Sequence, residues 1–102
     1  MTPSDWTKQP GETRTLEIDV SPALATGDSA ASLVSAHIYD EDGTLMDTSM
    51  IHGASSLSGN TVYVAVKGGT HKTRYWLEVK VATAGGDIAE DDLLITVKEK
   101  RP

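Results

Sequence analysis

The segment between residues 70 and 97 constrains the fold most, because it reads as two long strands joined by a glycine pair. Apolar or aromatic residues occupy the odd positions of residues 75–81, and polar residues occupy most of the even positions. This period of two buries one face of a strand and exposes the other. Gly85-Gly86 follows, and the period then returns at Leu93, Ile95 and Val97. Because glycine accepts the positive φ values of tight turns, the pattern predicts a long antiparallel hairpin.

The register of this hairpin decides which side chains face inward. A two-residue loop at Gly85-Gly86 would set Leu77 opposite Leu94 and turn the apolar residues of the second strand toward solvent. One extra residue near Asp91-Asp92 would restore the phase, so we predict a β-bulge there. A three-residue loop that includes Ala84 is the competing arrangement.

Shorter alternating segments precede the hairpin. Residues 14–20, 34–39 and 62–66 alternate apolar with polar side chains, and Gly, Pro and Asp mark the turns between them. Residues 45–51 contain two adjacent apolar pairs, so we expect a strand with an irregularity there. A single turn around Leu24 is expected to cap the sandwich. The whole pattern predicts an all-β fold, an immunoglobulin-like antiparallel β-sandwich of about seven strands.

The chain of 102 residues has the size of one domain. We expect an extended N-terminal arm at residues 1–11, the immunoglobulin-like β-sandwich at residues 12–98 and a charged C-terminal tail at residues 99–102. The interior is expected to hold the apolar side chains at alternate strand positions, namely Leu16, Ile18, Val34, Ile38, Val62, Val64, Val66, Leu77, Val79, Val81, Leu93, Ile95 and Val97.

Composition excludes several classes of protein. There is no cysteine, so the chain offers no disulfide, no thiolate metal site and no thiol nucleophile. The net charge of −6 opposes binding to the phosphates of nucleic acid. The N-terminus lacks the basic and apolar regions of a signal peptide, and no segment approaches the roughly 18 apolar residues of a membrane span. We therefore expect a soluble protein with no nucleic-acid or membrane partner.

One segment resembles a catalytic motif and three histidines could bind a metal, but a structural or solvated role explains both sets better. Gly27-Asp28-Ser29 resembles the start of the nucleophile block in one family of serine esterases, which also needs a histidine preceded by an acid three residues earlier. None of His37, His52 and His71 has that acid. We therefore expect residues 27–29 to form a turn. The spacings of the three histidines also match no metal motif, so we expect solvated histidines. No catalytic residue is predicted.

Acidic side chains gather in two places. Asp40-Glu41-Asp42 and Glu90-Asp91-Asp92, the latter with Asp87 nearby, carry the carboxylate oxygens that calcium prefers. Neither cluster has the spacing of a calcium loop. We interpret both as solvated turn and edge charge, and we predict no metal and no cofactor.

Tyr75 and Trp76 are neighbours with opposite expectations. Tyr75 lies near the start of the penultimate strand, where a tyrosine corner of an immunoglobulin-like sandwich bonds its hydroxyl to upstream backbone. Plain core burial is the alternative for Tyr75. Trp76 and Leu94 occupy even positions and should face outward, and the predicted bulge would set Leu94 opposite Glu78, diagonal to Trp76. This pair is a candidate docking surface, because interfaces favour tryptophan, or a local cover for the sheet.

Turn and strand-end signals along most of the chain resemble one family. The segments that carry the resemblance are Lys8-Gln9-Pro10-Gly11-Glu12, Ile18-Asp19, residues 24–28, Gly68-Gly69-Thr70 with Tyr75, and residues 83–88 with Glu90 and Asp91. Together they look like the small immunoglobulin-like structural proteins of tailed phages and prophages that are described as fiber-tail adaptors. Residues 40–58 depart from the family pattern, so no docking residue is carried over.

The resemblance implies a non-enzymatic structural module of a phage or prophage tail that works by protein–protein docking. Its implied partners are other phage structural proteins, and a homo-oligomer within the particle stays open. It further implies a virion component made in the cytoplasm of the bacterial host. The alternative is a carbohydrate- or surface-binding accessory immunoglobulin-like domain. An enzyme ranks third, because no base, nucleophile or metal set converges in the sequence.

Overall fold

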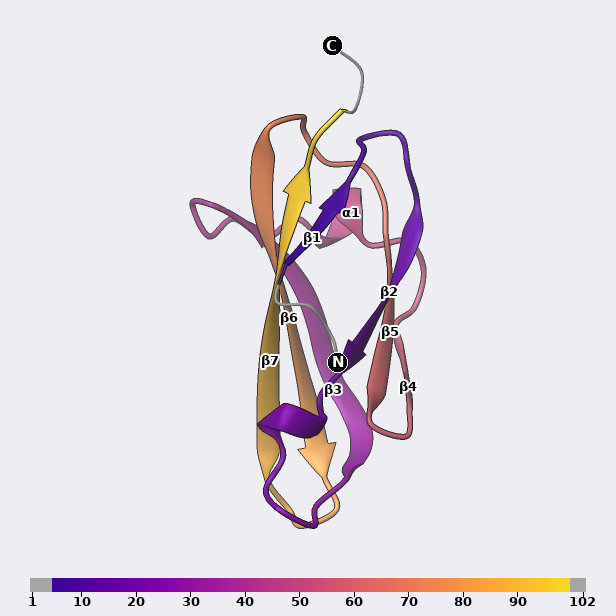
Figure 1. The fold of residues 1–102 in the computed structure, drawn as a ribbon, viewed down its shortest axis with the longest axis vertical. Coiled ribbons are helices and arrows are strands. Elements are labelled where there is room, and N and C mark those ends of the chain that lie inside the picture. The colour runs from indigo at the N-terminus through magenta and orange to yellow at the C-terminus, as the bar shows by residue number, and fades with distance from the viewer. Residues whose placement is uncertain (1–4, 100–102) are drawn as a thin grey trace.

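The structure is a computed structural model that describes residues 5–99. Within these residues seven strands form two sheets that pack as a β-sandwich (Figure 1), and the predicted all-β class is confirmed. The larger sheet has the order β1-β7-β6-β3 and the smaller sheet the order β2-β5-β4. The elements are β1 (Asp5–Lys8), β2 (Arg14–Asp19), the 3-10 turn η1 (Ser21–Ala23), β3 (Ala30–Asp40), α1 (Asp47–Met50), β4 (Ser56–Ser58), β5 (Thr61–Val66), β6 (Thr73–Thr83) and β7 (Ile88–Val97).

The hairpin of β6 and β7 has a three-residue loop and no bulge. Its ladder runs without a register shift from Thr73 opposite Val97 to Ala82 opposite Ile88. The Thr83 N–H donates to the Asp87 carbonyl at 2.9 Å, which leaves residues 84–86 as the loop. The bulge predicted near Asp91-Asp92 is therefore wrong, and the competing loop with Ala84 is present. The third loop residue shifts the pairing of the two strands by one position, so that Leu93, Ile95 and Val97 face the core. Gly86 takes the positive φ of +94° that such a loop requires.

The expected N-terminal arm contributes a strand to the larger sheet. β1 pairs in parallel with β7, with Trp6 opposite Ile95, and Figure 1 shows the two strands side by side. Lys8 at the end of β1 is only 1% exposed, and its Nζ donates to the carbonyl oxygens of Gln9 at 2.6 Å and Gly68 at 2.7 Å. These contacts hold residues 5–8 against the sandwich. Residues 1–4 of the arm and 100–102 of the tail lie outside the described residues.

The core contains the predicted apolar side chains with one exception. Val34 is 52% exposed, because β3 shifts register between Leu33 and Ser35 and Val34 is the extra residue. A bulge reverses the alternation, so Leu33 packs against the core in its place. The other predicted core residues are buried, and the core also includes Val20, Met50 and Tyr75.

The strand predicted at residues 45–51 is wrong, because residues 47–50 form the helical turn α1 and only Leu45 and Ile51 make isolated β-bridges. α1 is held by Asp47, whose Oδ1 accepts the Ile38 N–H at 2.7 Å and whose Oδ2 lies 2.6 Å from His37 Nδ1. Met50 ends the turn and is completely buried, whereas Ile51 forms a bridge with Val66. The turn thus explains why two adjacent apolar residues occur here. One side chain enters the core from α1 and the next lies on the following extended segment.

Candidate docking surface

The outer face of the larger sheet carries a row of three large side chains. Trp76 on β6 lies opposite Tyr39 on β3 and opposite Leu94 on β7. Its sequence neighbours Tyr75 and Leu77 are buried, so the indole points outward, where it is 47% exposed. Tyr39 and Leu94 are partly exposed. Because adjacent strands lie about 4.8 Å apart, these residues form a continuous strip, here called the aromatic row.

The structure changes one detail of the predicted pair. Leu94 lies directly opposite Trp76 rather than diagonal to it, because the bulge that would have shifted the register is absent. Tyr39 was missed as a member of the row. Its outward position follows from the alternation along β3, but its alignment with Trp76 depends on the register between β3 and β6, which two irregularities set.

A shallow hollow of about 330 Å³ borders the row, lined by Trp76, Leu94, Arg74 and Glu41. Arg74 Nε lies 3.1 Å from Glu41 Oε1, and more than half of each of these side chains is exposed. Such an exposed ion pair adds little to folding stability. The hollow therefore offers an apolar wall with both a positive and a negative group at its margin.

The other side of the row is acidic. His37, Glu78 and Asp92 form the next cross-strand row, and the carboxylates of Glu78, Glu90 and Asp92 lie within 4.8 Å of one another. Lys80 Nζ lies 3.7 Å from both Glu78 and Glu90. Partial loss of hydration raises the pKa of the exposed Asp92, and the neighbouring charges of Glu90 and Glu78 raise it further. Three carboxylates face one ammonium group, so this flank is electrostatically negative.

The acidic clusters seen in the sequence are divided by the strand geometry. Glu90 and Asp92 lie on the outer face with Glu78. Asp91 lies between them in the strand, opposite Val79, and therefore has the opposite parity. In the other cluster, Asp40 Oδ1 accepts the N–H groups of Asp42 and Thr44, both at 2.9 Å, and shapes the loop after β3.

The three histidines have separate surroundings. His37 Nδ1 contacts Asp47, and the His37 ring packs edge-on against Tyr39 with centroids 6.2 Å apart. His71 Nδ1 accepts the Glu99 N–H at 2.9 Å, and His52 is exposed in the segment after α1. Within residues 5–99 no histidine belongs to a cluster of potential metal ligands.

Asp28 has a structural use in the predicted turn at residues 27–29. Its Oδ1 accepts the N–H of Ser29 at 2.8 Å and that of Gly85 at 2.9 Å. The Ala84 N–H donates to the Ser29 carbonyl at 2.9 Å. A hydrogen bond with the Thr83 side chain, together with the backbone donors, lowers the pKa of Asp28. The segment thus ties the loop before β3 to the loop of the β6–β7 hairpin.

Tyr75 joins the core to the turn before β6. Its hydroxyl accepts the Thr70 N–H at 3.0 Å, and the residue is only 2% exposed. This is the backbone contact that a tyrosine corner makes. Gly69 permits the close approach of the turn, because a Cβ there would lie 2.6 Å from Val97 Cγ2.

Fold and surface together define a small two-sheet β-sandwich with an exposed aromatic row. The model of the family described as podophage GP4 fiber-tail adaptor protein gp77 matches residues 8–96 of the chain. The chain belongs to this family of phage adaptors, and the resemblance drawn from the sequence is confirmed. The family is one of structural adaptors, which is not an enzyme class.

A search of the curated proteins gives no match to the sequence. None of the helices within residues 5–99 is long and apolar enough to cross a membrane.

Proposed function

We propose that the protein is an adaptor in the tail of a podophage or related prophage, and that it acts by docking its aromatic row on another tail protein. The observation that carries this proposal is the half-exposed Trp76 aligned with Tyr39 and Leu94. The family name supports a place between tail and fiber. The protein would accordingly be a virion component, made in the cytoplasm of the bacterial host.

The exposed part of Trp76 is large enough to matter for binding. An aromatic side chain buries roughly 150–250 Å², so covering the exposed 47% of Trp76 removes roughly 100 Å² from water. At about 25 cal/mol per Å² this contributes roughly 2.5 kcal/mol. The indole is also rigid, so it loses little conformational entropy when a partner orders it. If Trp76 only covered Leu94, the exposed part of the indole would contribute no binding free energy.

The margins of the row indicate the chemistry of the partner. The flank at Glu78, Glu90 and Asp92 is negative, so we expect the docking face to present lysine or arginine beside an apolar pocket. Such charges chiefly raise the association rate and fix the orientation, whereas the apolar contact supplies affinity. Association should therefore slow as the salt concentration rises.

The experiment is the replacement Trp76→Glu in the phage. Because about half of the indole is already exposed to solvent, the purified variant should melt within a few degrees of the parent protein. It should nevertheless be missing from purified particles, because a carboxylate cannot enter an apolar pocket without losing its hydration.

Ile88→Glu is the matched control. Ile88 is 61% exposed and has the same outward parity on β7 as Leu94, at the far end of the hairpin. It should be incorporated normally. A well-folded Trp76→Glu variant present in particles at the level of the parent protein would eliminate this docking surface.

A further inference from the structure

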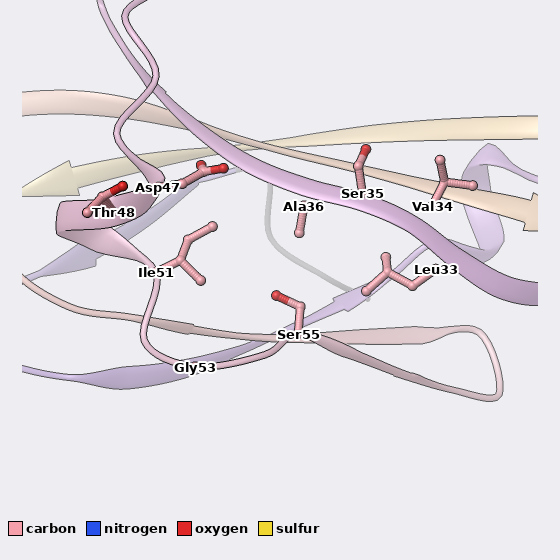
Figure 2. A pocket seen from close by; sticks show the side chains of 9 residues that line it. All are labelled: Leu33, Val34, Ser35, Ala36, Asp47, Thr48, Ile51, Gly53 and Ser55. Carbon is pink, nitrogen blue, oxygen red and sulfur yellow. The ribbon is translucent and has the colours of Figure 1, made fainter.

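A second surface feature lies where the edges of the two sheets separate. β3 is the last strand of the larger sheet and β4 the last strand of the smaller one. Between them is an open groove of about 460 Å³, lined by residues 33–36 of β3, the start of α1 and the segment around residues 51–55 (Figure 2). The groove lies at a sheet edge, whereas the aromatic row lies on the outer face.

The backbone of β3 bonds along this edge only over part of its length. The Ile38 carbonyl accepts the Met46 N–H at 2.7 Å, the Ile38 N–H donates to Asp47, and the Asp40 N–H donates to the Thr44 carbonyl at 2.9 Å. Residues 44–47 of the chain therefore cover the edge from Asp40 to Ile38. The cover ends there, because the chain turns into α1 at Asp47.

Ala36 continues the same edge inside the groove. Alternate residues of an edge strand direct both backbone groups to the same side, so Ala36 repeats the orientation of Ile38 and Asp40. From this side no group within residues 5–99 bonds to Ala36. An N–H donor and a carbonyl acceptor are thus presented in the geometry that an additional strand requires.

The floor of the groove is apolar. The side chains of Leu33, Ala36 and Ile51 point into the space between β3 and the segment at Gly53 and Ser55 (Figure 2). Leu33, Ala36 and Ile51 pack against the core and are only partly buried. An open backbone edge above an apolar floor suits an extended peptide, whose main chain bonds to the edge while alternate side chains cover the floor.

We propose that this groove receives an extended segment of a partner tail protein, which adds as a strand to the outer edge of β3 at residues 33–36. The inference rests on the proposed adaptor function, because an adaptor must hold two partners and the aromatic row provides for one. The inserted segment has small or apolar residues at alternate positions. It has no proline where its N–H must bond to the edge, since proline has no such group.

A second copy of this chain is a poorer occupant. β3 shifts register twice, between Ala30 and Ser32 and between Leu33 and Ser35, and each shift bends and twists the strand. Bulges of this kind keep two long edges from pairing flat. A short flexible segment can follow the bend, whereas the rigid β3 edge of another copy cannot.

The variant that tests the groove is Ala36→Phe, which fills the floor with an apolar side chain and removes no hydrogen bond. The expected result is a folded protein whose amount in purified particles falls at least tenfold. Ala31→Phe is the control on the same strand, because it makes the same change at an exposed residue of β3 that does not line the groove. It should be incorporated like the parent protein. Ala36→Pro, which removes the edge N–H, should repeat the loss if it folds.

Cross-linking identifies the occupant directly. The chain has no cysteine, so Val34→Cys carries a single benzophenone label at the rim of the groove. Irradiated particles should yield a cross-linked peptide from a different tail protein. Cross-links only to copies of this chain, no cross-link at all, or normal incorporation of folded Ala36→Phe would overturn the inference. Absence of the parent protein from particles would instead reject the proposed function itself.

Discussion

At the scale of single residues, Asp92 lies in an excess of negative charge on the outer face of the larger sheet. It shares the outer face with Glu78 and Glu90, and Lys80 lies 3.7 Å from each of those two glutamates. Partial loss of hydration and the neighbouring carboxylates raise the pKa of Asp92 above its ordinary value of 3.8. The folded protein therefore holds this proton more tightly than the unfolded chain does. Ionised Asp92 destabilises the fold above the raised pKa, and the penalty disappears as the pH falls.

The replacement Asp92→Asn should remove this penalty. At pH 7 and low salt the variant should melt a few degrees above the parent protein, since Asp92 is exposed and water screens much of the repulsion. The difference should vanish well below pH 3.8, where the aspartate is protonated in both states. Asp42→Asn, with the same change of charge in a distant exposed loop, should change little. A gain equal at pH 7 and pH 3 would contradict the electrostatic explanation.

At the scale of elements, Asp28 joins two loops that are distant in sequence. Its carboxylate accepts the Gly85 N–H, and a hydrogen bond with Thr83 lowers the pKa of Asp28. The stability that this contact adds is present above the ordinary pKa of 3.8 and is lost as the pH falls through the lowered value.

Asp28→Ala should lower the melting temperature only slightly at pH 7, because water replaces the carboxylate as acceptor of the exposed Gly85 N–H. Hydrogen exchange at Gly85 should also become faster, while exchange in the centre of β6 and β7 stays slow. Asp42→Ala serves as the control in another exposed turn. Unchanged protection of Gly85 in the Asp28 variant would show that the contact does not hold the loop.

Alternation of side chains predicted some elements well because burial of one face imposes it. β2, β5, β6 and β7 follow the period of two, and their inward residues Leu16, Val64, Leu77 and Ile95 are buried as predicted. β1 was missed, because residues 5–8 show no clear alternation and their parallel pairing with β7 uses backbone groups that every residue has. Val34 was misplaced because a bulge moves the phase without a distinctive side chain.

Only part of the candidate docking surface could be predicted from the sequence. Parity along β6 and β7 was enough to place Trp76 and Leu94 outward, where the structure has them. Their direct opposition depends on one loop residue, Ala84, and the sequence left both loop lengths open. Tyr39 and the groove beside Ala36 depend on the two register shifts of β3 and on α1. Contacts of that kind arise between distant segments, so local patterns do not signal them.

At the scale of the whole molecule, the sandwich presents two separate surfaces. The aromatic row lies on the outer face of the larger sheet, and the groove lies where β3 and β4 diverge. A family of fiber-tail adaptors is consistent with a body that holds two neighbours at once. In our proposals the aromatic row contacts one partner through side chains, and the groove contacts another through the backbone of β3.

The most direct test of docking by the aromatic row is an electron-microscopy map of the assembled tail at side-chain resolution. We predict that the Trp76 ring is buried in an apolar pocket of a different tail protein, with Leu94 and Tyr39 in the same contact and basic side chains near Glu78. A map that contains this chain with the Trp76 ring facing solvent, or facing only other copies of the chain, would contradict it.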